Sequence, residues 1–181
     1  MSTYTIFTWN VRGIHTPKRR YSIYSYLKRH SVHIAFLQDT HLALPEVSRL
    51  RRRWRGQLNA MGYSTFAKGA LIWIRPGVPF VEEVQIVDDQ GRYVLVQGHL
   101  AGRALVLGSI YAPNSEQASF FHILSCQLSG WSDYPWLLGW DFNSVLDPIL
   151  DFSFSPLPTA PTMAAARALS TWATNWRLLD I

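Results

Sequence analysis

The stretch Val32–Gln38, VHIAFLQ, is apolar at nearly every position. A strand covered on both faces has this pattern, whereas a strand with one wet face alternates apolar and polar residues. Upstream, Tyr4–Asn10 (YTIFTWN) is rich in β-branched and aromatic residues and predicts another strand. Pro17, between the two, suits the first turn of a helix. A strand–helix–strand opening of this length predicts parallel pairing of the two strands.

Downstream of this opening, the pattern predicts a second helix and then a run of short strands. The helix is expected over Glu46–Ala60, where an apolar stripe is surrounded by arginines: Arg49, Arg51, Arg52, Arg53 and Arg55. Between Tyr63 and Tyr111, turn signals separate short apolar runs, which predicts an antiparallel meander. Its strands are expected at Ala70–Arg75, Val81–Val87, Tyr93–His99 and Ala104–Tyr111.

The last third of the chain adds helices and strands of its own. Asn114 or Ser115 is expected to open a third helix, because Asn114 with Gln117 resembles a capping box. A further strand (Trp136–Phe142), a Pro-rich connection (Pro156–Pro161) and a last helix capped by Thr162, with Ala165, Leu169, Trp172 and Trp176 inside, are expected to follow. Leu178–Ile181 resembles the beginning of a strand, which indicates a truncated domain. Mixed strands among helices favour two packed sheets with helices outside, or one sheet with helices on both faces.

Composition restricts the class of protein. The 181 residues suit one domain, and 48% hydrophobic with 16% charged residues suffices for a core. The net charge of +5 comes mainly from arginine, which suits a polyanionic partner, although a merely soluble basic protein remains an equal alternative. The single cysteine, Cys126, excludes an internal disulfide or cysteine-based zinc site and is expected to be a small core residue. Neither a signal peptide nor a membrane-spanning stretch is recognisable, so we expect an intracellular, non-secreted protein without a membrane partner.

Polar side chains close several of these apolar strands. Asn10 ends the first predicted strand, Gln38 and Asp39 end the second, and Asp141 with Asn143 ends the strand near residue 140. Ligand sites favour strand ends and the loops that follow them. Carboxylate and carboxamide oxygens without cysteine suit Mg²⁺ or Mn²⁺. Each residue alone is more often a turn former, but together they predict a metal site.

Four segments in this order resemble the motifs of the exonuclease–endonuclease–phosphatase superfamily, whose fold is similar to that of deoxyribonuclease I. They are Thr8–Gly13 (TWNVRG), Leu37–Leu42 (LQDTHL), Gly108–Asn114 (GSIYAPN) and Gly139–Val145 (GWDFNSV). Arg51–Gln57 and Lys68–Ile72 further resemble the endonuclease domains of vertebrate LINE-type retrotransposons. The resemblance implies an α/β (α+β) fold of two packed mixed sheets flanked by helices, a four-layer α/β/β/α sandwich. Residues 1–181 would then be a single domain that is incomplete at its C-terminus.

The resemblance also implies roles at matching positions. Asp39 would be the main metal ligand, and Asn10 would help to hold the metal and the scissile phosphate. Tyr111 would hydrogen-bond the phosphate, Asp141 would orient the attacking water, and Asn143 would steady the transition state. Candidate DNA contacts lie beside these positions and on the arginine-rich helix: Arg12, His41, Asn114, Arg51, Arg52 and Arg53. For the arginines of the helix, a solvated face is the favoured alternative.

Three departures from the family pattern bear on activity. Position 39 is Asp rather than Glu, which shortens the side chain by one methylene, or roughly 1.5 Å. Trp140 replaces the second glycine of the family's GGDFN segment and could crowd Asp141 or the neighbouring strand. The family's terminal Ser-Asp-His is absent, and no histidine follows Asn143. His41, His99 and His122 do not replace it by motif.

Three functions therefore remain open from sequence. The resemblance implies a Mg²⁺-dependent endonuclease (Mn²⁺ as an alternative) that nicks target DNA in the nucleus and accompanies a reverse transcriptase. A related reaction on a lipid or soluble phosphoester is less compatible with the arginine-rich helix. The third alternative is a catalytically inactive, retrotransposon-derived fragment that binds nucleic acid, because the departures above favour inactivity.

Overall fold

The computed structural model describes residues 3–60, 68–144 and 160–179. The chain divides into two compact units, which are considered one at a time. The first contains Met1–Tyr111 and Trp131–Asp141, and the second contains Ala112–Gly130 and Phe142–Ile181. No helix among the described residues is long and apolar enough to cross a membrane.

The first sheet has the order β1-β2-β4-β3. β1 (Ile6–Asn10) pairs in parallel with β2 (Ile34–Gln38), and α1 (Pro17–Arg29) connects them, so the predicted strand–helix–strand opening is confirmed. Thr16 caps α1 by accepting a hydrogen bond from the amide of Arg19. β4 (Ala70–Ile74) runs antiparallel to both β2 and β3 (Gln57–Ala60).

The second sheet has the order β5-β6-β7-β8. β5 (Phe80–Val87), β6 (Tyr93–Leu100) and β7 (Arg103–Tyr111) form an antiparallel meander, and β8 (Trp136–Asp141) pairs in parallel with β7. The predicted meander is therefore correct for three strands but wrong for the first, because β4 lies in the other sheet. All five residues of β4 are buried, which a strand in the middle of a sheet covered on both faces requires.

The predicted second helix ends much earlier than Ala60. α2 spans Leu44–Arg53, and its stripe of Val47 and Leu50 is buried as expected. The helix stops because Trp54 is extended and Gly56 has a φ of +109°. A Cβ on Gly56 would lie 2.1 Å from the carbonyl oxygen of Ile74, so the chain can pass β4 there only as glycine. The residues after Gly56 then form β3 instead of a further helical turn.

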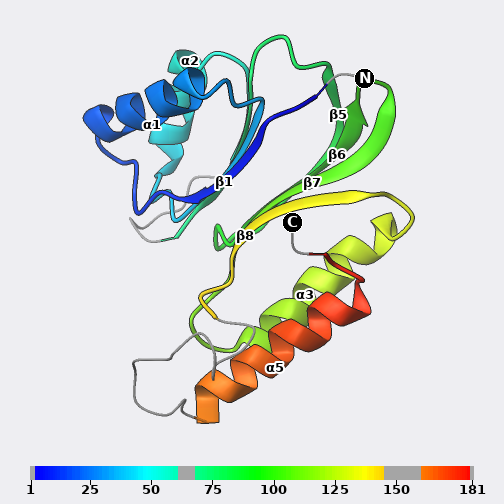
Figure 1. Cartoon of the computed structure of the whole chain (residues 1–181). Coiled ribbons are helices and arrows are strands. Elements are labelled where there is room, and N and C mark those ends of the chain that lie inside the picture. Colours follow the sequence, from blue (N-terminus) through cyan, green and yellow to red (C-terminus); the bar gives the residue numbers. More distant parts are fainter. Residues whose placement is uncertain (1–2, 61–67, 145–159, 180–181) are drawn as a thin grey trace. The chain divides into compact units, whose positions relative to one another are not determined.

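Helices and sheets of the first unit are stacked in layers (Figure 1). α1 and α2 cover the outer face of the first sheet, and a buried cluster joins them: Leu27, Val47, Leu50, Trp54, Leu71 and Trp73. A second buried cluster lies between the sheets and includes Ile34, Phe36, Ile72, Val94, Val96 and Leu107. Each such side chain contributes about 1.5–3 kcal/mol through burial, so these clusters hold the strand ends in place.

The strands at the sheet edges differ in how they are protected. β5 has a bulge between Glu82 and Val84 and is acidic at its start, both of which discourage pairing with another strand. β1 and β8 are also edge strands within the described residues, yet neither has a bulge, a proline or a basic residue. Both offer an unprotected edge for a further strand.

The second unit contains α3 (Gln117–Leu128) and α5 (Ala160–Asn175). Leu169 and Trp172 are buried as predicted, and the indole N–H groups of Trp172 and Trp176 donate to Ser125 Oγ over 3.1 and 2.9 Å. The predicted start of α3 at Asn114 or Ser115 is wrong, because the N-cap is Glu116 in a left-handed conformation.

Other expectations for this part of the chain have mixed outcomes. α5 begins before the predicted cap at Thr162, and the Pro156–Pro161 connection lies almost entirely outside the described residues. Leu178 and Leu179 form no strand, while residues 180–181 are not described. Cys126 is exposed rather than in the core, because it lies one turn after His122 on the outer face of α3.

Candidate active site

The ends of four strands meet at one end of the first unit. In the parallel pair β1–β2, Asn10 is opposite Gln38, and in the parallel pair β7–β8, Tyr111 is opposite Asp141. A hydrogen bond of 2.5 Å from Asn10 Nδ2 to Asp141 Oδ2 joins the two pairs. Carboxyl ends of strands from both sheets therefore converge, which brings together Asn10, Asp141 and Tyr111 from the predicted site.

The Asn10 side chain is fixed at both of its polar atoms. Its Oδ1 accepts a hydrogen bond of 2.9 Å from the amide of Arg12, and its Nδ2 donates to the Asp141 carboxylate. Only this orientation of the carboxamide satisfies both contacts, because a carboxylate accepts and an amide N–H donates. A charge-assisted hydrogen bond of this kind restricts the carboxylate of Asp141 to one orientation.

Asp39 follows β2 and lies in an unusual backbone conformation. Asp39 and His41 have φ values of +57° and +55°, and each left-handed residue costs of order 1–3 kcal/mol. Backbone hydrogen bonds hold this turn on both sides: Gly13 donates to the Asp39 carbonyl over 2.7 Å, and His41 donates to that of Lys68 over 2.8 Å. The side chains of Asp39 and His41 meet, with 2.7 Å between His41 Nε2 and Asp39 Oδ1.

A buried polar cluster beside the site was not predicted from sequence. Gln38 is fully buried, and its Nε2 contacts Thr8 Oγ1 at 3.2 Å and Ser109 Oγ at 3.3 Å. Ser109 Oγ in turn donates to the Leu37 carbonyl over 3.2 Å. These contacts join β1, β2 and β7 next to the converging strand ends. The sequence contains one indication of this cluster, because Gln38 is a polar residue at the end of an otherwise apolar strand.

Tyr111 is positioned through its backbone. Its amide donates a 2.6 Å hydrogen bond to the Arg92 carbonyl, and Arg92 makes a paired contact with the buried carboxylate of Asp88 at 2.8 and 2.7 Å. The hydrogen bond with Asp88 raises the pKa of Arg92 further, so this guanidinium stays charged. Burial raises the pKa of the neighbouring Tyr93 above its usual value. The turn between β5 and β6 is thus held firmly beside the end of β7.

Two predicted site residues lie in the second unit. Asn143 is exposed, has a φ of +47° and donates from Nδ2 to the Ala112 carbonyl over 2.7 Å. Gln117 Nε2 supports the same loop by donating to the carbonyls of Pro113 and Phe142 over 2.9 and 2.8 Å. Asn114 is exposed nearby in sequence.

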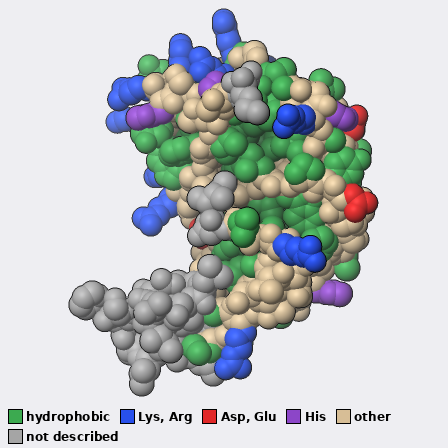
Figure 2. All heavy atoms as spheres, turned by 45° about the vertical axis from the view of Figure 1, so that its right-hand side comes forward, with side chains coloured by type: hydrophobic (Ala, Val, Ile, Leu, Met, Phe, Trp, Pro, Cys, Tyr) green, Lys and Arg blue, Asp and Glu red, His purple; other side chains and the backbone are tan. Residues whose placement is uncertain are grey.

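The predicted DNA-contacting arginines differ in their surroundings. Arg51 donates to the carbonyls of Leu58 and Ala60 at 3.4 and 3.3 Å, which joins α2 to β3. Arg52, Arg53 and Arg12 are exposed. On the face shown in Figure 2, most basic side chains stand apart with uncharged surface between them.

The two positions of the GWDFN segment before Asp141 behave differently. A Cβ on Gly139 would lie 2.4 Å from Phe36 Cβ in the opposite sheet. Trp140 is half-buried and stays in register with Ile110, and β8 continues through it to Asp141. The indole therefore does not interrupt the strand that presents Asp141.

The oxygen atoms of this site suit a hard metal ion. No group of three His, Cys, Asp or Glu side chains able to hold a metal occurs within residues 3–60, 68–144 and 160–179. The site offers instead the carboxylates of Asp39 and Asp141 with the carboxamide of Asn10, and Mg²⁺ commonly takes only one or two carboxylates besides water and phosphate. The residues present thus fit Mg²⁺ by donor chemistry.

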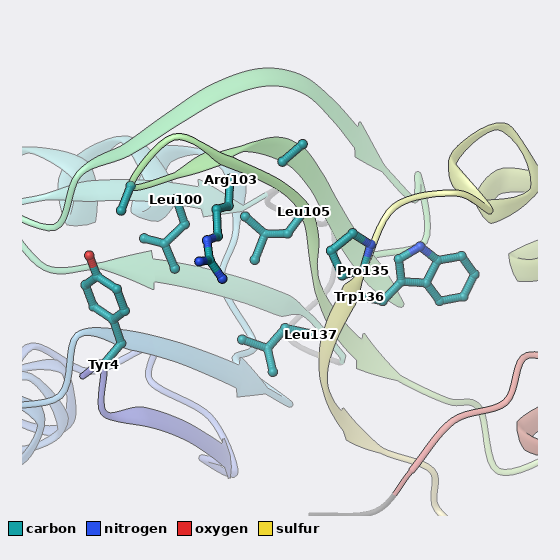
Figure 3. Close-up of a pocket in the computed structure, with 9 residues that line it drawn as sticks. Tyr4, Leu100, Arg103, Leu105, Pro135, Trp136 and Leu137 are labelled. Atoms are coloured by element: carbon teal, nitrogen blue, oxygen red, sulfur yellow. The ribbon is translucent and has the colours of Figure 1, made fainter. Parts of the chain in front are cut away.

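A cavity of about 460 Å³ in the first unit lies away from this site (Figure 3). It is mainly apolar, and Tyr4, Leu100, Leu105 and Leu137 line it together with Arg103. The cavity adjoins the start of β8, whereas Asp141 is at its end, about 16 Å away at the usual rise per strand residue. Its apolar lining offers no carboxylate, so the chemistry points to the strand ends instead.

Comparison with known proteins identifies the family. Residues 7–178 match the endonuclease/exonuclease/phosphatase family, and the chain belongs to this family. It is 28% identical over 148 residues to an uncharacterized 149 kDa protein of transposon TX1 from Xenopus laevis. The match covers 79% of this chain but 11% of that protein, so the chain corresponds to a small part of its relative.

Solved structures confirm the fold class. The endonuclease domain of TRAS1, a telomere-specific non-LTR retrotransposon, has a TM-score of 0.63 at 13% identity, covering 94% of this chain and 71% of that one. The AP endonuclease LMAP from Leishmania major has a TM-score of 0.72 at 14% identity, covering 96% and 66%. TDP2 from D. rerio complexed with a single-strand DNA product has a TM-score of 0.60 at 19% identity, covering 86% and 66%. The chain thus has the predicted deoxyribonuclease I-like fold and is related to retrotransposon endonucleases.

Proposed function

We propose that the chain hydrolyses phosphodiester bonds of DNA as a metal-dependent endonuclease and nicks target DNA for a LINE-type retrotransposon. The observation that carries this proposal is the hydrogen bond between Asn10 and Asp141, because it holds a carboxylate where the strand ends of both sheets meet. The family match and the relationship to a transposon protein support the assignment. The TRAS1 domain that shares the fold is the endonuclease domain of a non-LTR retrotransposon.

Each residue has a definite task in this proposal. Asp141 accepts a proton from the attacking water and aligns it, while Asn10 keeps the carboxylate in one orientation. Tyr111 offers its hydroxyl to a phosphate oxygen, and Asn143 donates to the developing negative charge. Positioned donors of this kind, aimed at charge that develops in the transition state, are often the largest contribution to catalysis.

The proposed metal is Mg²⁺, with Mn²⁺ as a substitute, held by Asp39 and Asn10. When bound, the ion offsets charge on the phosphate oxygens and polarises the P–O bond. Asp39 supplies a charged oxygen, and the Asn10 oxygen keeps one lone pair besides the one that accepts from Arg12.

DNA is the proposed partner. Arg12, Arg52 and Arg53 are exposed and would contact phosphates, whose recognition favours the planar guanidinium group. The partly exposed His41 and the exposed Asn114 of the second unit would contribute polar contacts. Such a protein would act in the nucleus beside a reverse transcriptase of the same element.

A second candidate is DNA binding without cleavage. It is favoured by Asp39, which has a shorter side chain than the glutamate of the family pattern and is engaged by His41. Misplacement of a catalytic group by about 1 Å can lower a rate on the order of 100-fold.

Nicking of supercoiled plasmid by the purified chain separates the two candidates. The assay is run with Mg²⁺, with Mn²⁺ and with EDTA, on the chain itself, on Asp141→Asn and on Asp133→Asn. Asp133 is an exposed aspartate of the same unit and serves as the control. The endonuclease proposal expects metal-dependent nicking that falls by about 10²–10⁴-fold in Asp141→Asn only.

Absence of nicking by the folded chain, with salt-dependent DNA binding retained, would refute cleavage and support the second candidate. Equal nicking by the chain and Asp141→Asn would remove Asp141 from catalysis.

A further inference from the structure

His41 lies against the carboxylate that is proposed to hold the metal. The 2.7 Å contact joins His41 Nε2 to only one oxygen of Asp39, Oδ1. An ionised carboxylate can only accept, so the Nε2 atom carries the proton and donates it. Within the part of the chain that the structure describes, no hydrogen bond reaches Oδ2 of Asp39.

The backbone is shaped so that this contact forms. Asp39 and His41 are both left-handed, with φ values of +57° and +55°, and only Thr40 separates them. Thr40 is 2% exposed and donates from its amide to the Gly69 carbonyl over 3.1 Å, which anchors the middle of the turn. Two like conformations around an anchored residue turn the flanking side chains toward each other.

The His41 imidazole packs closely against Gly13. A Cβ on Gly13 would lie 3.0 Å from His41 Nδ1, and Gly13 itself has a φ of +81°. The ring is therefore bounded by Gly13 on one side and by Asp39 on the other. Its side chain is 28% exposed and that of Asp39 is 15% exposed, so solvent only partly screens the contact.

We propose that His41 is a positioning residue that holds Oδ1 of Asp39 and directs Oδ2 to the metal. The proposal rests on the proposed function, because it assumes that Asp39 is the metal ligand. It assigns His41 a task other than contact with DNA. Hydrogen-bond partners of metal ligands orient those ligands, and their loss typically weakens metal binding about 10- to 100-fold.

Mn²⁺ titration measures the effect of His41 on metal affinity directly and needs no catalytic activity. Free Mn²⁺ is followed by electron paramagnetic resonance during titration of the 181-residue chain, His41→Ala, His41→Gln and Asp39→Ala. We expect one Asp39-dependent site that weakens about 10- to 100-fold in His41→Ala. His41→Gln keeps an N–H donor and should restore most of the affinity, which a role in folding alone would not explain.

His99→Gln is the matched control. His99 Nδ1 contacts Glu83 Oε1 at 3.2 Å in the same unit, away from the strand ends, so Mn²⁺ affinity should not change. Binding that depends on Asp39 but is the same in His41→Ala would overturn the role of His41 alone. Absent binding, or binding unchanged in Asp39→Ala, would overturn the proposed metal site and with it the role of His41. Circular dichroism of each variant in EDTA establishes that it is folded.

Discussion

Replacement of Gly139 by alanine tests how closely the two sheets approach beside the site. The new Cβ would lie 2.4 Å from Phe36 Cβ and 2.6 Å from its Cγ and Cδ2. Phe36 is 1% exposed and cannot turn into solvent, and two of these atoms lie close to its own backbone. The sheets themselves must therefore move apart for the methyl group to fit.

The expected loss of stability follows from this overlap. Overpacking of a well-packed core typically costs about 1–3 kcal/mol. We expect Gly139→Ala to cost about 2–3 kcal/mol, in the upper half of this range, because the overlap involves a Cβ rather than the flexible end of a side chain. Gly130→Ala is the control: nothing lies within 4 Å of a Cβ at Gly130, so its stability should stay the same or rise slightly.

Urea denaturation followed by tryptophan fluorescence measures both variants, and a double-mutant cycle identifies the cause. Phe36→Ala removes two of the three overlapping atoms, so Gly139→Ala should cost at least about 1 kcal/mol less in that background. A loss below about 0.5 kcal/mol for Gly139→Ala would refute the overlap as the cause. Additive effects of the two substitutions would refute a contribution from the Phe36 ring, because Phe36→Ala keeps the Cβ atom that lies closest.

Three further predictions concern single contacts. Asp88→Ala removes the partner of the Arg92 guanidinium and should lower the free energy of unfolding by about 3 kcal/mol; a loss under 1 kcal/mol in urea denaturation would contradict it. Burial raises the pKa of Tyr93 above 10.0, so the unfolded chain loses this proton first and stability should fall as pH rises through that value. Tyr93→Phe should remove the loss of stability at alkaline pH that comes from Tyr93. Identical profiles of unfolding free energy against pH for the chain and for Tyr93→Phe would contradict this prediction. Thr16→Ala removes the side-chain cap that accepts from the Arg19 amide and should cost about 1 kcal/mol, while Thr16→Ser should retain it; equal melting temperatures for all three chains would argue against capping.

Secondary structure was predictable where the pattern is local. The apolar run of β2 indicated a buried strand and the β-branched run of β1 indicated a strand, and both strands were found at the expected positions, with every residue of β2 buried. The helix over Glu46–Ala60 failed because Leu58 continues the helical spacing of Val47, Leu50 and Trp54. One glycine in a left-handed conformation, Gly56, outweighs that spacing and turns the chain into β3.

Sheet membership was harder to predict than the strands themselves. Strands that follow each other in sequence usually pair, which favoured placing Ala70–Ile74 in the meander. It pairs instead with β2 and β3, and β2 is separated from it by a helix and a further strand. Pairing between strands so far apart depends on which buried faces fit together, and short sequence windows do not contain that information.

In the candidate site too, the residues could be predicted from local sequence, whereas the contacts between them could not. Asn10, Asp39 and Asp141 were predicted as strand-end oxygens, and the structure places Asn10 and Asp141 in direct contact. The contact of His41 with Asp39 was not predicted, because it requires positive φ at two residues that are not glycine. The metal-ligand role of Asp39 stays a prediction that Mn²⁺ titration can test.

The geometry of β8 also explains why a tryptophan is accepted beside Asp141. Successive side chains of a strand point to opposite faces, so Gly139 and Asp141 share one face and Trp140 lies on the other. The shared face is turned to the first sheet, where a Cβ at 139 would meet Phe36 and where Asp141 meets Asn10. Bulk is therefore excluded at 139 by the packing of the two sheets, whereas bulk at 140 points away from Asn10. Trp140 is consequently a weaker reason to expect inactivity than Asp39, whose side chain is one methylene shorter than the glutamate of the family pattern.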